Sequence, residues 1–334
     1  MKKILLNSGS FIFLIFIFFF AFIFLKTSFT LSKITTDIKD KNKELIYLLP
    51  ELDDLPEKTN NEFNFLLLGQ RGEGKPFGGL LTDTIMLVNI NQSTNKTALI
   101  SLPRDLYIPL PDSRKRDKIN AVYASGYEKG GVGLGLKYIK DTVSRITGLY
   151  VDNVAVVNFE AFEEIINAIG GIDVYLKEDF IEGKQWWCDE DGNNCRDFFL
   201  PKGDNSLDGK KALFYVRSRF SSSDFDRARR QQEVLLAIKQ KVFSLGFAAN
   251  PLNIFEILDI LGNNVRTDMG INEIKEIISY LKNNSANLKD LQSVVFDNGP
   301  DGLLYSRYLN NQYILLPKAG NFSEIQKRCQ ILAN

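Results

Sequence analysis

The sequence predicts a layered α/β fold with a mixed central sheet. Residues 64–68 form a short apolar run that stops at Gly69, which is typical of a buried strand. The apolar runs 85–90 and 97–102 flank the turn-rich segment 91–96, so we expect them to pair as an antiparallel hairpin. These strands form the first half of the predicted sheet.

Helices and strands then alternate along the chain. Residues 137–146 and 160–169 have helical patterns, and a glycine pair ends the second of them. Residues 154–158 and 172–176 are apolar and strand-like. Helices that alternate with apolar strands indicate helical layers packed on a sheet, and the hairpin makes part of that sheet antiparallel.

One transmembrane helix is expected before this fold. An apolar run extends from Phe11 to Leu25, and with residues 4–6 it reaches about twenty residues, enough to cross a bilayer core. A cleavable signal peptide is the alternative, although no small-residue cleavage site follows the run. Lys2 and Lys3 precede it, so the positive-inside rule predicts a single-pass protein of the cell membrane with a cytoplasmic N-terminus and an extracytoplasmic domain.

Composition excludes several classes of function. The 41 basic and 41 acidic residues cancel, so there is no electrostatic footprint for nucleic acid. The chain has no histidine, which excludes histidine-ligated zinc, a Ser-His-Asp triad and a Cys-His pair. Of the three cysteines, Cys188 and Cys195 flank a short acidic segment and can close a local disulfide in an oxidising exterior, which leaves Cys329 unpaired.

Two carboxylates are candidates for a metal site. Asp83 comes before one strand of the predicted hairpin and Asp105 follows the other, so both should reach the same edge of the sheet. Magnesium needs only one or two protein carboxylates when substrate phosphate supplies further oxygens. Helix capping or structural salt bridges are the alternative for both residues, because the surrounding patterns are short.

A predicted helix over 226–245 carries arginines on its buried face. Its apolar stripe is Val234, Ile238, Val242 and Leu245. Projected backwards, this stripe passes through Gln231, Arg230 and Arg227. Arginines on a core-facing stripe either pair inside the protein, here with Asp224 or Asp226, or line a pocket. Arg229 projects in another direction, toward water.

Several motifs occur in a characteristic order. They are Thr82–Met86, Ser101–Asp105, Asp117–Tyr123, Val157–Phe162, Gly170–Val174, Leu207–Leu213, Tyr215–Arg219, Asp224–Arg227 and Arg230–Gln232. In this order the chain resembles the LytR-CpsA-Psr family of cell-wall glycopolymer transferases over about residues 60 to 245. The resemblance implies a three-layer α/β/α sandwich whose apolar cavity holds a polyprenyl tail, with a mouth that binds pyrophosphate.

The resemblance also implies an activity, namely transfer of a glycosyl phosphate from a polyprenyl pyrophosphate carrier to a peptidoglycan hydroxyl. It implies catalytic roles for Asp105, Arg104 and Arg217, and a Mg²⁺ or Mn²⁺ ion on Asp83 and Asp105. The residues expected to bind pyrophosphate are Arg104, Arg217, Arg219, Arg227, Arg230, Gln231 and Lys118. The general base is Asp105 or Asp224. Lys118 either supports Asp105 or touches phosphate, and a structural salt bridge is the alternative for it.

The chain departs from the family at the end of the first strand. An acidic turn such as Gly-Ser-Asp is usual there, whereas this chain has Gly69, Gln70 and Arg71. Arg71 is therefore a further candidate for a phosphate contact. A polyprenyl pyrophosphate hydrolase, and a non-catalytic envelope-binding or scaffolding protein, are the alternative functions.

This interpretation divides the chain into five parts. They are a cytoplasmic tail (1–8), a transmembrane signal anchor (9–25), a polar stalk (26–60), a LytR-CpsA-Psr-like catalytic domain (61–245) and a C-terminal region (246–334). In the C-terminal region we expect helices at 251–261 and 271–281 and strands at 291–296 and 312–316. This region either completes the main domain or forms an appendage.

Overall fold

A computed structural model describes most of the chain after the expected stalk. The described residues are 55–75, 79–113, 115–188, 195–243, 262, 264–270, 273 and 291–334. The predicted cytoplasmic tail, the transmembrane anchor, most of the stalk and the helix expected at 251–261 lie outside them, as does nearly all of 271–281. Within the described ranges, no helix combines the length and the apolar character that a bilayer crossing requires.

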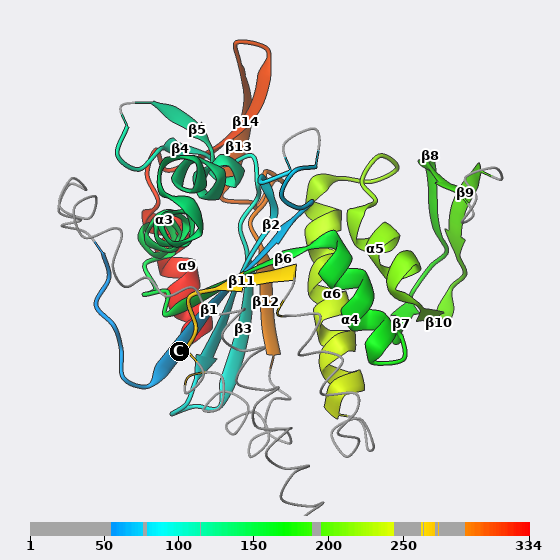
Figure 1. Ribbon diagram of the computed structural model, residues 1–334. Coiled ribbons are helices and arrows are strands. Elements are labelled where there is room, and N and C mark those ends of the chain that lie inside the picture. Colours follow the sequence, from blue (N-terminus) through cyan, green and yellow to red (C-terminus); the bar gives the residue numbers. More distant parts are fainter. Residues whose placement is uncertain are drawn as a thin grey trace, which may run out of the picture.

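A six-stranded mixed sheet forms the centre of the molecule (Figure 1). Its strands, in spatial order, are β11 (Val265–Thr267), β6 (Asn153–Asn158), β1 (Glu62–Gln70), β2 (Thr82–Asn91), β3 (Lys96–Ser101) and β12 (Leu291–Val295). β1, β2 and β3 are antiparallel neighbours, which confirms the predicted hairpin. β6 runs parallel to β1, and β12 runs parallel to β3. The mixed central sheet is therefore present.

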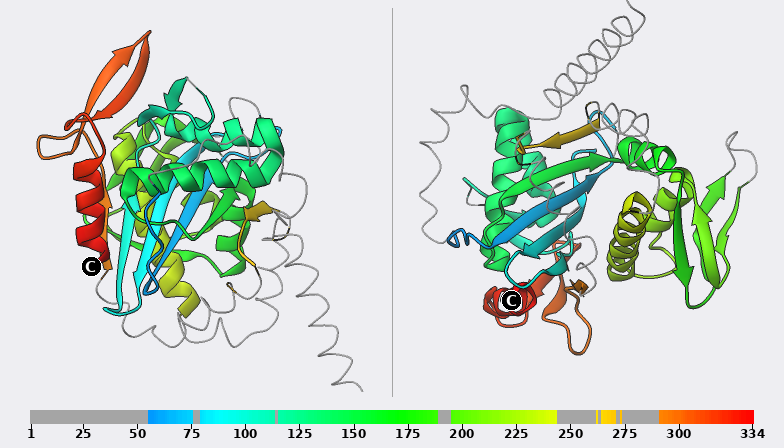
Figure 2. Two further views of the ribbon diagram at one scale, coloured as in Figure 1. Left: turned by 90° about the vertical axis from the view of Figure 1, so that its left-hand side faces the viewer. Right: turned by 90° about the horizontal axis from the view of Figure 1, so that it is seen from below.

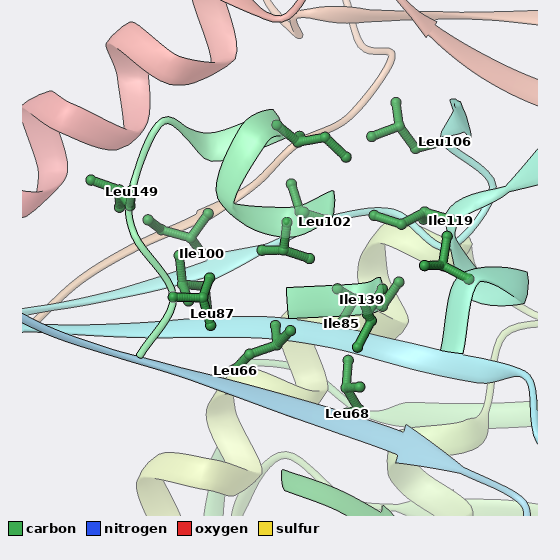
Figure 3. Close-up of a cluster of buried hydrophobic side chains, with 14 of the residues drawn as sticks. Leu66, Leu68, Ile85, Leu87, Ile100, Leu102, Leu106, Ile119, Ile139 and Leu149 are labelled. Carbon is green, nitrogen blue, oxygen red and sulfur yellow. The ribbon is translucent and has the colours of Figure 1, made fainter. Parts of the chain in front are cut away.

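One face of the sheet is covered by α3 (Val122–Thr147) and α9 (Ser323–Ala333). Alternate residues of β1 point into this layer, and Leu66 and Leu68 are fully buried there. Figure 3 shows them packed with aliphatic side chains of β2, β3 and α3. α3 is much longer than the predicted helix at 137–146 because it continues backwards through a kink at Gly130 and Gly131, where Gly131 has a φ of 75°.

The opposite face is covered by α4 (Phe159–Ala168), α5 (Gly209–Arg217) and α6 (Asp224–Phe243), as Figure 1 and the right-hand view of Figure 2 show. The Asn158 side chain accepts a hydrogen bond from the Ala161 amide at 2.7 Å, so it caps α4. α6 begins two residues before the predicted helix at 226–245. The helices on both faces give the layered arrangement that the alternating pattern predicts.

One predicted strand belongs elsewhere. β7 (Ile172–Leu176) pairs with β10 (Gly203–Leu207) in a separate two-stranded sheet, outside the central sheet. This small sheet packs against α4, α5 and α6 through a second apolar cluster that includes Ile172, Val174 and Leu207. It buries the outer side of the helical layer.

Three further antiparallel strand pairs lie outside the central sheet in the described part of the domain. They are β4 (Tyr107–Pro109) with β5 (Arg116–Lys118), β8 (Phe180–Cys188) with β9 (Cys195–Leu200), and β13 (Leu304–Leu309) with β14 (Gln312–Pro317). A disulfide joins Cys188 to Cys195 across β8 and β9, with Cα atoms 4.1 Å apart. Figure 2 shows β13 and β14 projecting from the body of the molecule.

The described parts of the C-terminal region belong to the same domain. β11 and β12 form the two edges of the central sheet, and α9 packs on α3. Cys329 lies on α9, fully buried in the core between these helices and the sheet. The strands and the helix from this region therefore complete the main fold, because both sheet edges depend on them.

Candidate functional site

The N-terminal end of β2 contains a β-bulge at Asp83. Gly69 pairs with Thr84 and Gln70 pairs with Thr82, so Asp83 is the extra residue between two paired positions. The sequence places Asp83 before this strand, whereas the structure places it inside β2, because the strand begins at Thr82. A Cβ atom on Gly69 would come within 2.8 Å of the Thr84 hydroxyl oxygen, so only glycine fits opposite the bulge. A bulge turns a side chain away from the regular alternation of the strand.

Arg104 lies at the centre of a group of carboxylates. Its Nη1 donates to Asp83 Oδ1 at 2.8 Å, and its Nε lies 3.3 Å from Asp224 Oδ1 and 3.7 Å from Asp105 Oδ2. Burial opposes the charge of Arg104, but Asp224 and Asp83 outweigh it and raise the pKa of the guanidinium. Burial likewise opposes the ionised form of Asp83, yet Arg104 lowers the pKa of this carboxyl.

Arg227 joins the same group from the first turn of α6. Its Nη1 lies 3.0 Å from Asp224 Oδ1, and its Nη2 donates to the Asp83 carbonyl oxygen at 2.9 Å. Burial lowers the pKa of Arg227, while Asp224 opposes that shift. Both interpretations of this arginine are therefore partly correct, because it makes the buried ion pair with Asp224 and also faces the site.

Lys118 and Asn120 complete the network from the segment around β5. Lys118 Nζ lies 2.6 Å from Asp105 Oδ1, and Asn120 Nδ2 donates to Asp83 Oδ1 at 3.4 Å. Arg219 Nη1 lies 3.7 Å from Asp224 Oδ1. We call this group the charged cluster, and its ionic members are Asp83, Arg104, Asp105, Lys118, Arg219, Asp224 and Arg227. Four cations face three carboxylates, so the cluster has an excess of positive charge.

An apolar cavity of about 240 Å³ lies next to the charged cluster, between the sheet and α4, α5 and α6. Most of its lining is apolar and includes Leu67, Met86, Val157, Phe162, Ile165, Val234, Leu235 and Ile238. Its polar lining residues are Thr84, Asn158, Arg217 and Gln231. Gln231 also lines a small hollow formed by charged-cluster residues, so it marks the junction between the cavity and the cluster.

Arg217, the last residue of α5, belongs to the cavity. Its guanidinium carbon lies 4.4 Å from the centre of the Phe159 ring, a cation–π contact. Burial lowers the pKa of Arg217, and the positive charge of Arg71 lowers it further. A phosphate bound beside Arg217 would relieve part of this repulsion.

Arg230 is not brought to the charged cluster. Its Nε donates to the Tyr215 carbonyl oxygen at 3.1 Å, and its Nη2 donates to the Ser218 carbonyl oxygen and to Ser222 Oγ. The guanidinium also lies against the Phe180 ring, 5.0 Å from its centre. In this position Arg230 holds the connection between α5 and α6, from which Arg219 projects.

Arg229 points away from the site, as the sequence predicts. Half of its side chain is exposed, and it pairs with Asp226 at 2.7 Å and with Asp297 at 3.1 Å. This placement makes it a suitable control for the other arginines of α6.

Two residues that shape the site were not anticipated. Gln232 Nε2 donates to Ser101 Oγ at 2.8 Å and to the Val294 carbonyl oxygen at 3.0 Å, which fixes α6 to β3 and β12. Glu182 is fully buried and accepts hydrogen bonds from Ser221 Oγ at 2.6 Å and from the Phe220 amide at 3.0 Å. The motif Arg230–Gln232 was the available signal for Gln232, which lies off the predicted apolar stripe of α6, whereas nothing local indicated Glu182.

The carboxylates of the charged cluster suit a hard cation. Asp83 and Asp105 supply only oxygen atoms, and both reach Arg104. Over the described ranges, no group of three or more acidic or cysteine side chains is arranged for metal binding by itself. The residues fit a magnesium ion that takes its remaining ligands from water and substrate phosphate.

Comparison with known proteins identifies the family. The family model described as LytR_cpsA_psr family matches residues 21–331. The chain belongs to the LytR-CpsA-Psr family. This assignment agrees with the order of motifs between Thr82 and Gln232.

Curated relatives and a solved structure support the assignment. The polyisoprenyl-teichoic acid–peptidoglycan teichoic acid transferase TagU of Enterococcus faecalis is 28% identical to this chain. The alignment covers 90% of this chain and 93% of TagU. The corresponding TagT of Bacillus subtilis is 32% identical over 75% of this chain and 73% of its own length. A structure of TagT bound to LIIa-WTA superposes with a TM-score of 0.60 at 26% identity, over 82% of this chain and 91% of that one.

Proposed function

We propose that this protein is a phosphotransferase that moves a glycopolymer from a polyprenyl pyrophosphate carrier to peptidoglycan. The observation that carries the proposal is an apolar cavity that lies beside a cluster with excess positive charge. A lipid pyrophosphate has the same division, with an apolar tail and a polyanionic head. The printed activity of the TagU and TagT relatives supports this substrate class.

The donor would lie across the junction at Gln231. Its isoprenoid units would contact Leu67, Phe162 and Leu235, which line the cavity. Its phosphates would lie next to Arg217 and the charged cluster. Phosphoryl transfer depends on positioning and on neutralising charge on the phosphate oxygens, which four clustered cations supply.

A divalent cation would be held by Asp83 and Asp105. When bound, Mg²⁺ or Mn²⁺ would neutralise further charge on the phosphate oxygens. Arg104 already orients both carboxylates through its contacts at 2.8 Å and 3.7 Å. Asp83 and Asp105 both form ion pairs with Arg104, so we expect a bound cation to weaken these two ion pairs.

The reaction itself would be an in-line displacement. The acceptor hydroxyl oxygen attacks the phosphorus that carries the glycan, and a new phosphorus–oxygen bond forms. The bond from this phosphorus to the bridging oxygen breaks, so polyprenyl monophosphate leaves. We assign the base to Asp105, which pairs with Lys118 and one guanidinium group, whereas Asp224 Oδ1 is shared among three guanidinium groups. The hydroxyl proton would pass to Asp105.

The membrane topology is part of the proposal. Lys2 and Lys3 before the apolar run 11–25 support an uncleaved anchor with the catalytic domain outside the cytoplasm. Protease added to intact protoplasts should digest the domain. Protection of the domain until the membrane is lysed would refute this orientation.

Reconstitution tests the activity. The full chain is incubated with a polyprenyl-pyrophosphate-linked glycan, peptidoglycan and Mg²⁺, and both lipid monophosphate and peptidoglycan-bound glycan are measured. Arg104→Gln and Asp83→Asn should lower both products by at least about a hundredfold, as loss of a transition-state contact typically does. Arg229→Gln is the matched control and should retain full activity.

The same assay separates the alternatives. Lipid monophosphate without glycan on peptidoglycan would identify a hydrolase, in which water attacks. Complete lack of turnover by the wild-type chain, with binding of either substrate retained, would support an envelope-binding protein.

A further inference from the structure

We propose that the β13–β14 hairpin binds the acceptor glycan and presents its hydroxyl to the charged cluster. This inference rests on the proposed transferase function and extends it to the second substrate. The hairpin carries Tyr308, whose side chain is 73% exposed. Tyr308 pairs across the strands with Tyr313, and the two rings meet nearly edge to face with centroids 5.7 Å apart.

The base of the hairpin is attached directly to the site. The Leu315 amide donates to the Asp105 carbonyl oxygen at 2.9 Å, and Leu315 also forms a β-bridge with Leu106. Figure 1 shows the hairpin rising from the end of the sheet where α6 begins. Asp105 therefore lies where the hairpin joins the body of the molecule.

Tyr308 and Tyr313 lie on the same face of the hairpin as Leu315, the residue that bonds to Asp105. Side chains two residues apart on a strand share a face, so Tyr313 lies on the same face as Leu315. Tyr308 extends the same face outwards from the site.

The position of the hairpin fits the acceptor rather than the donor. In-line transfer requires the attacking hydroxyl and the leaving lipid phosphate on opposite sides of the phosphorus. The lipid cavity borders the charged cluster at Thr84 and Gln231, whereas the hairpin borders it at Asp105. Arg104 connects Asp83, beside the cavity, to Asp105, beside the hairpin. The two substrates would therefore approach from different sides.

The chemistry of the hairpin suits a sugar chain. Aromatic faces pack against the C–H faces of pyranose rings, and the tyrosine hydroxyls can bond to sugar hydroxyls. The turn at the tip is Asn310 and Asn311, followed by Gln312, all amides that both donate and accept hydrogen bonds. A surface that inserts into a lipid membrane would instead require apolar or cationic residues at the tip.

Co-sedimentation with purified peptidoglycan sacculi tests the proposal. In the full-length chain, Tyr308→Ala should weaken binding to sacculi by about fivefold or more, which is the typical effect of losing an aromatic contact. Tyr308→Trp should retain it, because a larger aromatic face remains. Tyr175→Ala is the matched control, since Tyr175 is 61% exposed on β7 and far from the hairpin in Figure 1. Melting temperatures should match the wild type in all three variants.

Three results would overturn the proposal. The first is unchanged sacculus binding in Tyr308→Ala. The second is failure of the wild-type chain to bind sacculi at all. The third is an equal loss of sacculus binding in Tyr175→Ala, because the effect would then not be specific to the hairpin.

A separate measurement distinguishes this failure from failure of the proposed function. Binding of a short-chain polyprenyl pyrophosphate should be the same in Tyr308→Ala and in the wild type. Absence of that binding from the wild-type chain would count against the transferase, whereas loss of sacculus binding alone in Tyr308→Ala supports the acceptor site.

Discussion

The two faces of the central sheet are built from the same strands but are filled differently. Leu66 and Leu68 of β1 point toward α3, where they are fully buried in a packed core. Leu67 lies between them and points toward α4, α5 and α6, where it lines an apolar cavity. Packed interiors leave few voids as large as this, so an apolar space of this size beside α4, α5 and α6 is suited to a ligand. The α3 face stabilises the fold, and the opposite face is available for binding.

The largest expected effect on stability is on the packed face. Leu66→Ala should lower the free energy of unfolding by about 2–5 kcal/mol, because it leaves a void that the surroundings cannot fill. Urea denaturation measures this change. A loss below about 1 kcal/mol would mean that the α3 face is as loosely filled as the other.

A matched pair of enlargements compares the two faces directly. Leu136→Phe in the packed core of α3 should cost about 1–3 kcal/mol through overpacking. Leu235→Phe places the same added bulk in the cavity, so its cost should be clearly smaller. It should nevertheless weaken binding of a polyprenyl pyrophosphate by about tenfold, because a ring occupies space for the tail. Equal costs and unchanged lipid affinity would contradict the comparison.

At the junction of cavity and cluster, Arg227→Lys should affect binding more than stability. Lysine keeps the charge but replaces a planar fork with a single ammonium, so it cannot serve Asp224 and the Asp83 carbonyl together. We expect affinity for polyprenyl pyrophosphate to fall by about tenfold in calorimetry. Arg229→Lys is the control. Loss of stability with unchanged affinity would assign Arg227 a purely structural role.

The smallest expected effect is on how the stability of the fold depends on pH. The pKa of Asp83 in the fold lies below its ordinary value of 3.8, so its contribution to stability is present above about pH 4. It is lost as the pH falls through the lower, folded-state pKa. Thermal melts of the wild type and Asp83→Asn should therefore converge at low pH. A difference between them that does not shrink as the pH falls below 4 would exclude this origin.

Local sequence patterns were sufficient to predict much of the fold. The hairpin of β2 and β3 and the helix α6 were predicted because each has a regular apolar period within a short segment. The family motifs also placed Asp83, Arg104 and Arg227 in one site, and the structure brings them together. Arg217 and Gln231, which were expected to bind pyrophosphate, line the apolar cavity.

Long-range contacts account for what the sequence did not predict. Arg230 shares the stripe of Arg227, yet Phe180 and the Tyr215 carbonyl, from other segments, hold its guanidinium away from the cluster. The bulge at Asp83 depends on the register between β1 and β2, which has no signal in either strand alone. β7 has a clear strand pattern, but only its partner β10 determines which sheet it joins.

The burial of Cys329 has a consequence for oxidative folding. Three thiols can pair in three ways, and only one pairing is present in the fold. Cys188 and Cys195 are separated by 7 residues, so their encounter in the unfolded chain is fast. Docking of α9 on α3 encloses Cys329 and raises its pKa to about 12, which suppresses the thiolate needed for exchange. The short loop and the buried third thiol therefore both favour the single pairing of Cys188 with Cys195.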